Sequence, residues 1–440
     1  MGRRPIALLL LALVGCTGSP GVKGPSTSPN PPPPTASGRA SVPEFPFPQP
    51  AVWFAPMPPP AGAADYMDLF DGNGGWENAA GRVDVFQLSG QWVARYATDD
   101  ELRRLVIDLD RRGLAVALEA RTLIPTNGCG VGSDGFAQPS ERLRALRRLE
   151  TAGATGRLLR FVAFDRPFAF GHTEEGPSGC GWSGPKIARQ VAAYVKDVRS
   201  TFPDMQFGDV EPLDGTTTIE ELEAWITTFE DVAGSRLAFF HLAIDAGSSD
   251  WMARATEVAA FCRSHGVAFG VVYAGQGDTD QAWSASAENR FVQFEAKTGG
   301  HPDDVVIQSD IGRPQRLLPE TQSGTLTHLL DRYLRTRTAL DMEVGPSEYV
   351  GSVRATGTLF DVAGNVIASA SIRLTLMPLD RPGQPTPVDL GTRITDERGS
   401  FRLTFHEPGV LLHLGRVLVE AWFPGDTRRW PAYVQSTITA

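Results

Sequence analysis

The chain has 440 residues, with 41 lysines and arginines against 51 aspartates and glutamates, so its formal net charge is −10. At about 100–200 residues per domain, this length allows two or three domains. The acidic balance argues against a nucleic-acid partner, which would require a basic face. Four cysteines are too few for a disulfide-rich scaffold.

Residues 1–16 have the pattern of an export signal. Two arginines precede an apolar run that is too short to span a bilayer. The run ends in Leu13-Val14-Gly15-Cys16, which resembles the lipobox of bacterial lipoproteins. The resemblance implies that Cys16 is lipidated after cleavage and that acyl chains anchor the protein to a membrane. Thr17, in place of an aspartate, favours an outer-membrane or cell-surface location, and an ordinary secretory signal is the alternative.

Residues 17–50 are rich in proline, serine, glycine and threonine and contain almost no aliphatic side chains. Such a segment does not bury a core of its own. We therefore expect an extended, polyproline-like tether that lifts a folded part away from the membrane.

Residues 51–340 alternate short β-rich runs with amphipathic segments of helical period. Eight strands are predicted, at 51–56, 83–88, 114–120, 158–165, 206–211, 237–245, 267–274 and 304–310. The clearest helices are predicted at 99–112, 141–150, 186–201, 219–232, 250–265, 280–297 and 325–335. Eight alternating strands predict an α/β fold, a (β/α)8 TIM barrel. An open doubly wound sheet is the alternative, but no glycine-rich phosphate fingerprint follows the first strand.

After residue 340 the runs become short and alternating, with glycine-containing turns and no helical stretch between them. This pattern predicts an antiparallel β-sandwich over residues 348–440. The turns around Gly357, Asp361 and Gly399 resemble those of bacterial Ig-like and carboxypeptidase-regulatory-like modules. The resemblance implies a spacer or a glycan-binding accessory, and a cell-surface adhesin that acts through this domain is a further hypothesis.

Two cysteines lie in glycine-rich loops that would open on one face of the barrel: Cys129 after the third strand and Cys180 after the fourth. In an oxidising compartment we expect a Cys129–Cys180 disulfide, with two unpaired thiols as the alternative. Cys262 lies in an apolar stretch of a predicted helix and is expected to be buried and free. No His/Cys pair has metal-ligand spacing, so we expect neither a metal nor a cofactor.

Polar residues gather at the predicted carboxyl ends of the strands, where the active sites of such barrels lie. Alternation places Asp209 and Glu211 on one face of the fifth strand, and Asp165 ends the fourth. We therefore expect these three acids to converge on one mouth. Further candidates at this end of the barrel are Glu119, His241, Asp245, Tyr273, Gln308 and Trp182.

Convergent carboxylates suit glycosidic-bond hydrolysis, in which one protonates the leaving oxygen and the other attacks or activates water. Four aromatic residues near the same ends are candidates to stack on sugar rings: Trp53, Trp182, Tyr273 and Trp283. Each residue also has a structural interpretation. An acid at a strand end can cap a helix or pair with an arginine, and His241 and the aromatics can belong to the core. Their joint occurrence on consecutive strands favours a site.

Val210-Glu211-Pro212 resembles the Asn-Glu-Pro strand end of many barrel glycoside hydrolases, in which the glutamate is the general acid/base. In that family the motif ends the fourth strand, whereas Glu211 lies on the fifth. Asp165-Arg166-Pro167 does end the fourth, with arginine in the place of the acid. The resemblance implies Glu211 as proton donor with Asp165 or Asp209 as its partner. Arg166 implies the alternative, a barrel in which Asp165 acts alone or catalysis has decayed.

The sequence thus favours an exported, lipid-anchored glycoside hydrolase of the bacterial envelope that acts on a polysaccharide or oligosaccharide. Glu119, His241, Tyr273 and Gln308 would orient the sugar. The alternative is a non-catalytic glycan-binding lipoprotein on the same barrel. The sequence contains no Gly-x-Ser-x-Gly, no phosphate-binding Gly-x-x-x-x-Gly-Lys and no His-Glu-x-x-His, which argues against a serine hydrolase, NTP use and a standard zinc protease.

Overall fold

The computed structural model describes residues 50–72, 75–121, 143–173, 180–213, 217–244, 247, 249–347, 352–380, 386–406 and 416–439. All described residues belong to one compact unit of the chain. Within these ranges, no helix combines the length and the apolar character needed to cross a membrane.

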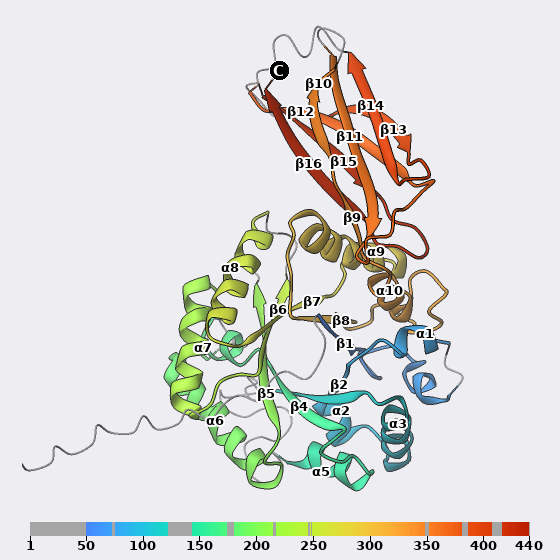
Figure 1. The fold of residues 1–440 in the computed structure, drawn as a ribbon. Coiled ribbons are helices and arrows are strands. Elements are labelled where there is room, and N and C mark those ends of the chain that lie inside the picture. Colours follow the sequence, from blue (N-terminus) through green and yellow to red (C-terminus); the bar gives the residue numbers. More distant parts are fainter. Residues whose placement is uncertain are drawn as a thin grey trace, which may run out of the picture. The chain divides into compact units, whose positions relative to one another are not determined.

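Eight parallel strands close into a barrel in the order β1 to β8 (Figure 1). They are β1 (Ala51–Ala55), β2 (Val85–Ser89), β3 (Ala115–Ala120), β4 (Leu159–Asp165), β5 (Gln206–Leu213), β6 (Phe239–Ile244), β7 (Ala268–Tyr273) and β8 (Asp304–Gln308). Pairing of β1 with β8, from Ala51 with Asp304 to Ala55 with Gln308, closes the sheet. The predicted TIM barrel is therefore confirmed, and the open sheet is excluded.

Helices cover the outside of the barrel. The longer ones are α2 (Gly90–Arg95), α3 (Asp99–Arg112), α5 (Arg144–Thr151), α6 (Gly184–Thr201), α7 (Ile219–Ala233), α8 (Trp251–Ser264), α9 (Asp280–Phe291) and α10 (Leu326–Tyr333). Shorter segments are η1 (Tyr66–Phe70), α1 (Glu77–Ala80) and the π-helical η2 (Ala169–Thr173) and η4 (Val292–Lys297). Thr218 starts α7 with the capping box that its spacing from Glu221 predicts.

Alternate residues of each strand face either the barrel interior or the helices. The interior is filled by three large aromatic rings, Trp53, Phe161 and Phe239, and by small side chains between them. Phe207 of β5 instead belongs to the larger core between the strands and the helices. This alternation decides which polar residues at the strand ends face the mouth of the barrel.

Two antiparallel sheets follow the barrel. One contains β9 (Thr338–Leu340), β10 (Glu343–Pro346), β11 (Ser352–Asp361) and β14 (Ser400–His406), and the other contains β13 (Val388–Ile394), β12 (Ser371–Pro378), β15 (Arg416–Phe423) and β16 (Ala432–Thr439). They share a hydrophobic core of their own. The β-sandwich is as predicted, but β9 and β10 pair with β11, so its strands begin at Thr338, ahead of residue 348.

One side chain from the segment between β15 and β16, Trp430, belongs to the core of the barrel unit and is 2 % exposed. Its ring stacks on Phe291 of α9 with 5.1 Å between the centroids. Its indole Nε1 donates a hydrogen bond of 2.8 Å to the backbone oxygen of Tyr333, at the end of α10. The sandwich therefore completes the core beside α9 and α10.

Candidate active site

Polar side chains from β2, β3 and β8 meet at the carboxyl end of the barrel. Gln87 and Ser89 of β2, Glu119 of β3 and Gln308 of β8 line one small cavity. Their side chains point into the barrel, because alternate residues of a strand share a face. Ala117, two residues before Glu119, and Val306, two residues before Gln308, are inward-facing core residues. Glu119 and Gln308 were predicted to lie here. Gln87 and Ser89 were missed, although a glutamine in an otherwise apolar strand was an available signal.

Glu119 also belongs to a cluster of two carboxylates and two guanidinium groups. Arg121 Nε lies 2.8 Å from Asp165 Oδ2 and 3.7 Å from Glu119 Oε1. On the other side of Asp165, Arg166 Nε lies 3.5 Å from Oδ1. The side chains of Glu119 and Asp165 are 19 % and 15 % exposed, so the cluster is partly accessible from the mouth.

Arg166 has a backbone φ of 49°, in the left-handed region that non-glycine residues seldom adopt. Such a conformation costs on the order of 1–3 kcal/mol and is found most often at functional sites. The conformation places the guanidinium 4.4 Å from the centre of the Phe170 ring, as well as beside Asp165. Arg166, which has this strained backbone, thus occupies the position at which the resemblance to glycoside hydrolases predicts an acid.

The expected convergence of three acids is wrong for Asp209 and Glu211. Both follow Phe207 at every second position along β5, so their side chains lie on the same face of the strand as its ring. Phe207 faces the helices rather than the barrel interior. Asp209 Oδ2 accepts a 2.6 Å hydrogen bond from the indole of Trp225 on α7, and its Oδ1 accepts one from the backbone NH of Val210. The structure therefore keeps these two acids away from the mouth, where Asp165 lies.

Glu211 is fully buried and caps the backbone after β4. Its Oε1 accepts from the NH of Phe168 at 2.6 Å and its Oε2 from the NH of Ala169 at 3.0 Å. Burial raises the pKa of Glu211 well above its usual range, and the nearby Asp209 raises it further. Burial likewise raises the pKa of Asp209 to about 7. Both acids are thus hydrogen-bonded to the surrounding protein on the outer side of the sheet.

Three of the four aromatic residues considered for sugar stacking are core residues. Trp53 and Tyr273 are fully buried, and Trp283 is 2 % exposed. Tyr273 faces the helices, where its hydroxyl donates a 2.9 Å hydrogen bond to Glu295 of η4. Trp182 differs, because it is only partly buried in the connection before α6 and has the Lys186 Nζ 3.6 Å from its ring centre.

His241 lies deeper in the barrel than predicted, in a pair with an acid that the sequence analysis did not single out. Its Nε2 is 3.1 Å from Asp304 Oδ2, and both side chains are fully buried. Gly270 of β7 makes the pair possible, since a Cβ there would lie 2.3 Å from His241 Cδ2. The ring also meets Trp53 edge-on at 4.9 Å, so His241 is part of the interior packing.

Three predicted site residues, Cys16, Cys129 and Asp245, lie outside the described residues. The Cys129–Cys180 disulfide consequently stays a prediction. Cys262 is buried and free as expected, and burial raises the pKa of its thiol to about 12. The side chains that the structure describes include no cluster of three or more His, Cys, Asp or Glu suited to a metal ion.

Several solved structures are similar to this chain at 10 % sequence identity. A GH51 alpha-L-arabinofuranosidase from Thermotoga petrophila RKU-1 has a TM-score of 0.38, with 75 % of this chain and 87 % of that chain covered. An endo-beta-1,4-mannanase double mutant of Cellulomonas fimi has 0.37, with 88 % and 93 % covered. A beta-glucuronidase of Bacteroides uniformis has 0.43, with 90 % and 46 % covered. No protein-family model matches the sequence, and no curated protein does.

Proposed function

We propose that the protein is an exported, lipid-anchored protein that binds a glycan at the carboxyl-end mouth of its barrel. The observation that carries this proposal is the cluster of Glu119, Arg121, Asp165 and Arg166 at the mouth. The amides and the hydroxyl of Gln87, Gln308 and Ser89 adjoin it. Together these groups supply hydrogen-bond donors and acceptors for sugar hydroxyls at the place where barrels of this fold bind their ligands.

The geometry favours binding over hydrolysis. Hydrolysis requires one carboxylic acid that donates a proton to the leaving oxygen. At the mouth, both carboxylates lie beside Arg121, and an arginine stands where the family resemblance expects the acid. The acids with raised pKa, Asp209 and Glu211, face away and hydrogen-bond to neighbouring protein groups.

Hydrolysis is the second candidate function, and one observation favours it. Glu119 and Asp165 lie on the neighbouring strands β3 and β4, and both face the barrel interior. Two carboxylates that flank one space are the arrangement that glycosidic-bond cleavage uses. In this second candidate they replace Asp209 and Glu211 as the reacting pair.

The membrane part of the proposal is supported by the sequence alone. The segment that ends in Cys16 resembles a lipobox, and the proline-rich tether after it separates the anchor from the barrel. A lipid-anchored barrel on such a tether meets glycans at the cell surface, which is consistent with binding at an open mouth.

Replacing Asp165 with asparagine tests the binding site. The change removes the charge between Arg121 and Arg166, so we expect affinity for the bound glycan to fall at least tenfold. A panel of polysaccharides and cell-wall glycans identifies the ligand with the intact mature protein, and calorimetry measures the affinity. The matched control is Asp110→Asn, an ion-paired acid 48 % exposed on the outer helix α3, which should bind normally.

Mass spectrometry of released saccharides separates the two candidate functions. Binding without release, lost in Asp165→Asn, supports the proposal. Release that disappears in both Glu119→Gln and Asp165→Asn establishes the second candidate. Release that survives these changes but disappears in a folded Glu211→Gln protein would contradict the proposed site and restore the acid that the sequence predicts.

A further inference from the structure

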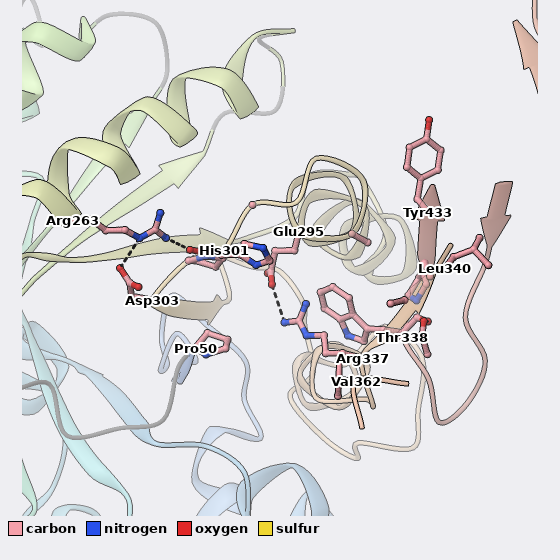
Figure 2. Close-up of a pocket in the computed structure, with 17 residues that line it drawn as sticks. Pro50, Arg263, Glu295, His301, Asp303, Arg337, Thr338, Leu340, Val362 and Tyr433 are labelled. Carbon is pink, nitrogen blue, oxygen red and sulfur yellow. Dashed lines mark hydrogen bonds and ion pairs between the residues drawn. The ribbon is translucent and has the colours of Figure 1, made fainter. Parts of the chain in front are cut away.

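Two cavities of the barrel unit differ in how their polar groups are bound. The larger one, of about 740 Å³, lies beside the amino ends of β1 and β8 (Figure 2). Its charged groups are paired within its wall. Arg337 Nη2 lies 2.8 Å from Oε2 of the buried Glu295, and Arg263 pairs with Asp303. The smaller cavity, of about 10 Å³, lies at the carboxyl-end mouth and contains a buried acceptor of a different kind.

That acceptor is the side-chain amide of Gln87 on β2. Gln87 is 5 % exposed, and its Oε1 has no hydrogen-bond partner among the residues that the structure describes. Val85, two residues earlier on β2, belongs to the barrel interior, so Gln87 also points inward. A buried amide oxygen without a donor is unfavourable and uncommon in folded proteins. Gln87 therefore presents to the cavity an acceptor that a ligand can satisfy.

The lining of this cavity has a buried side and a partly exposed side. Ala55 and Ser309 are buried beside Gln87. Ser89, Glu119 and Gln308 are partly exposed, so the cavity is reached from the mouth. A volume of about 10 Å³ is space for one oxygen-sized group. The cavity can thus take up a single hydroxyl, and a methyl, an acyl group or a further sugar attached to that oxygen would not fit.

The groups around the cavity select a neutral hydrogen-bond donor. Oε1 of Gln87 and the carboxylate of Glu119 both accept hydrogen bonds, so the entering group must donate one. The negative charge of Glu119 disfavours a carboxylate or a sulfate. Arg121 Nε lies 3.7 Å from Oε1 of Glu119 and balances that charge, so a cation is not required. A sugar hydroxyl meets each of these conditions.

We infer that Gln87 determines the specificity of the proposed glycan site by accepting a hydrogen bond from one unsubstituted hydroxyl of the bound sugar. The class of ligand that it selects is a sugar unit with a free hydroxyl at this position. Units that are deoxygenated, methylated, acylated or glycosidically linked there are rejected. The inference rests on the proposed binding of a glycan at the mouth, and it adds the residue that recognises the sugar.

Gln87→Met tests the inference, because methionine has a similar length and lacks the amide. In the intact mature protein, calorimetry against the panel of polysaccharides and cell-wall glycans should show binding about tenfold to hundredfold weaker than in the unmodified protein. The matched control is Gln206→Met. Gln206 is a buried glutamine whose Oε1 likewise has no partner among the described residues, but it lies at the amino end of β5, so binding should be unchanged.

Modified sugars supply a measurement that leaves the protein unaltered. The probes are methyl glycosides of the sugars found in the bound polysaccharide, intact and with one hydroxyl removed at a time, and saturation-transfer NMR measures their binding. We expect removal of one particular hydroxyl to weaken binding to the unmodified protein about tenfold or more. The same removal should have no effect on binding to Gln87→Met, because the two changes delete the same interaction.

The outcomes separate this inference from the proposed function. Equal affinity of Gln87→Met and the unmodified protein, or an equal response to the removal of every hydroxyl, would overturn the inference and leave glycan binding standing. Urea unfolding should show no loss of stability in Gln87→Met, and a large loss would assign the amide to the fold and overturn the inference. Binding abolished by a chelator would identify a metal ion as the partner of Gln87 and also overturn it. If the unmodified protein bound no glycan of the panel, the proposed function would fail, and the inference with it.

Discussion

Replacing Trp430 with alanine is expected to lower the free energy of unfolding by about 3–5 kcal/mol, the usual cost of removing a large buried aromatic side chain. The ring is almost fully buried and packs against Phe291, Tyr333 and the Arg337 guanidinium. Its loss would leave a cavity and would take away the hydrogen bond that the indole donates to Tyr333. Urea unfolding followed by far-UV circular dichroism measures the change.

Trp422→Ala is the matched control, because Trp422 is a sandwich tryptophan that is only partly buried. We expect it to cost clearly less than Trp430→Ala. If the Trp430→Ala protein instead unfolded in two transitions, with that of the barrel unchanged, the sandwich would be an independent module. One transition that shifts as a whole would show that the sandwich contributes to the stability of the barrel. Deletion of residues 348–440 is the direct test of the adhesin hypothesis. In that case the deletion would also lower the stability of the barrel.

The order of strands and helices could be predicted closely, because each element carries its own periodicity. The predicted 99–112 helix matches α3, and the eight predicted strands fall within a few residues of β1 to β8. Strand alternation also showed that Asp209 and Glu211 share a face. It did not show which face, because the fifth strand has apolar residues on both sides.

The inward face of β5 is set by a contact with the next strand. Gly208 points toward the interior, where a Cβ would lie 2.2 Å from the ring of Phe239 on β6. The small residue therefore goes inside, next to a large one, and Phe207 and Asp209 go outside. A glycine that alternates with the acids was the available signal for this orientation.

Contacts between distant segments were beyond the reach of local patterns. Trp430 lies 97 residues from its hydrogen-bond partner Tyr333. The sequence alone separates the sandwich from the barrel by composition, whereas the structure joins them through Trp430 and through contacts such as the 2.6 Å hydrogen bond from Arg335 to the backbone oxygen of Asp426. The pairing of Arg121 with Asp165 also joins separate segments, since Arg121 follows β3, Asp165 ends β4, and the pairing of these two strands brings them together.

Raising the pH from 5 to 8 is expected to destabilise the protein through Asp209 and Glu211. Burial raises the pKa of Asp209 to about 7, and that of Glu211 lies well above its ordinary value. A carboxyl whose pKa is higher in the folded state binds its proton more tightly there, so its contribution to stability is fully present below about pH 4 and is lost as the pH rises through the folded-state value. At 1.36 kcal/mol per pKa unit, the loss from Asp209 alone is on the order of 3 kcal/mol, and Glu211 adds to it.

Asp209→Asn identifies the source of that loss. The change removes one of the two titrating groups and the like charge that raises the pKa of the other, so the decline in unfolding free energy between pH 5 and pH 8 should become about half as steep. Asp110→Asn, an exposed acid on α3, should leave the decline unchanged. Urea unfolding at several pH values measures all three proteins. A decline as steep in Asp209→Asn as in the unmodified protein would contradict this prediction. It would mean that the two carboxyls are already ionised in the folded protein, so that other interactions offset the cost of burying their charges.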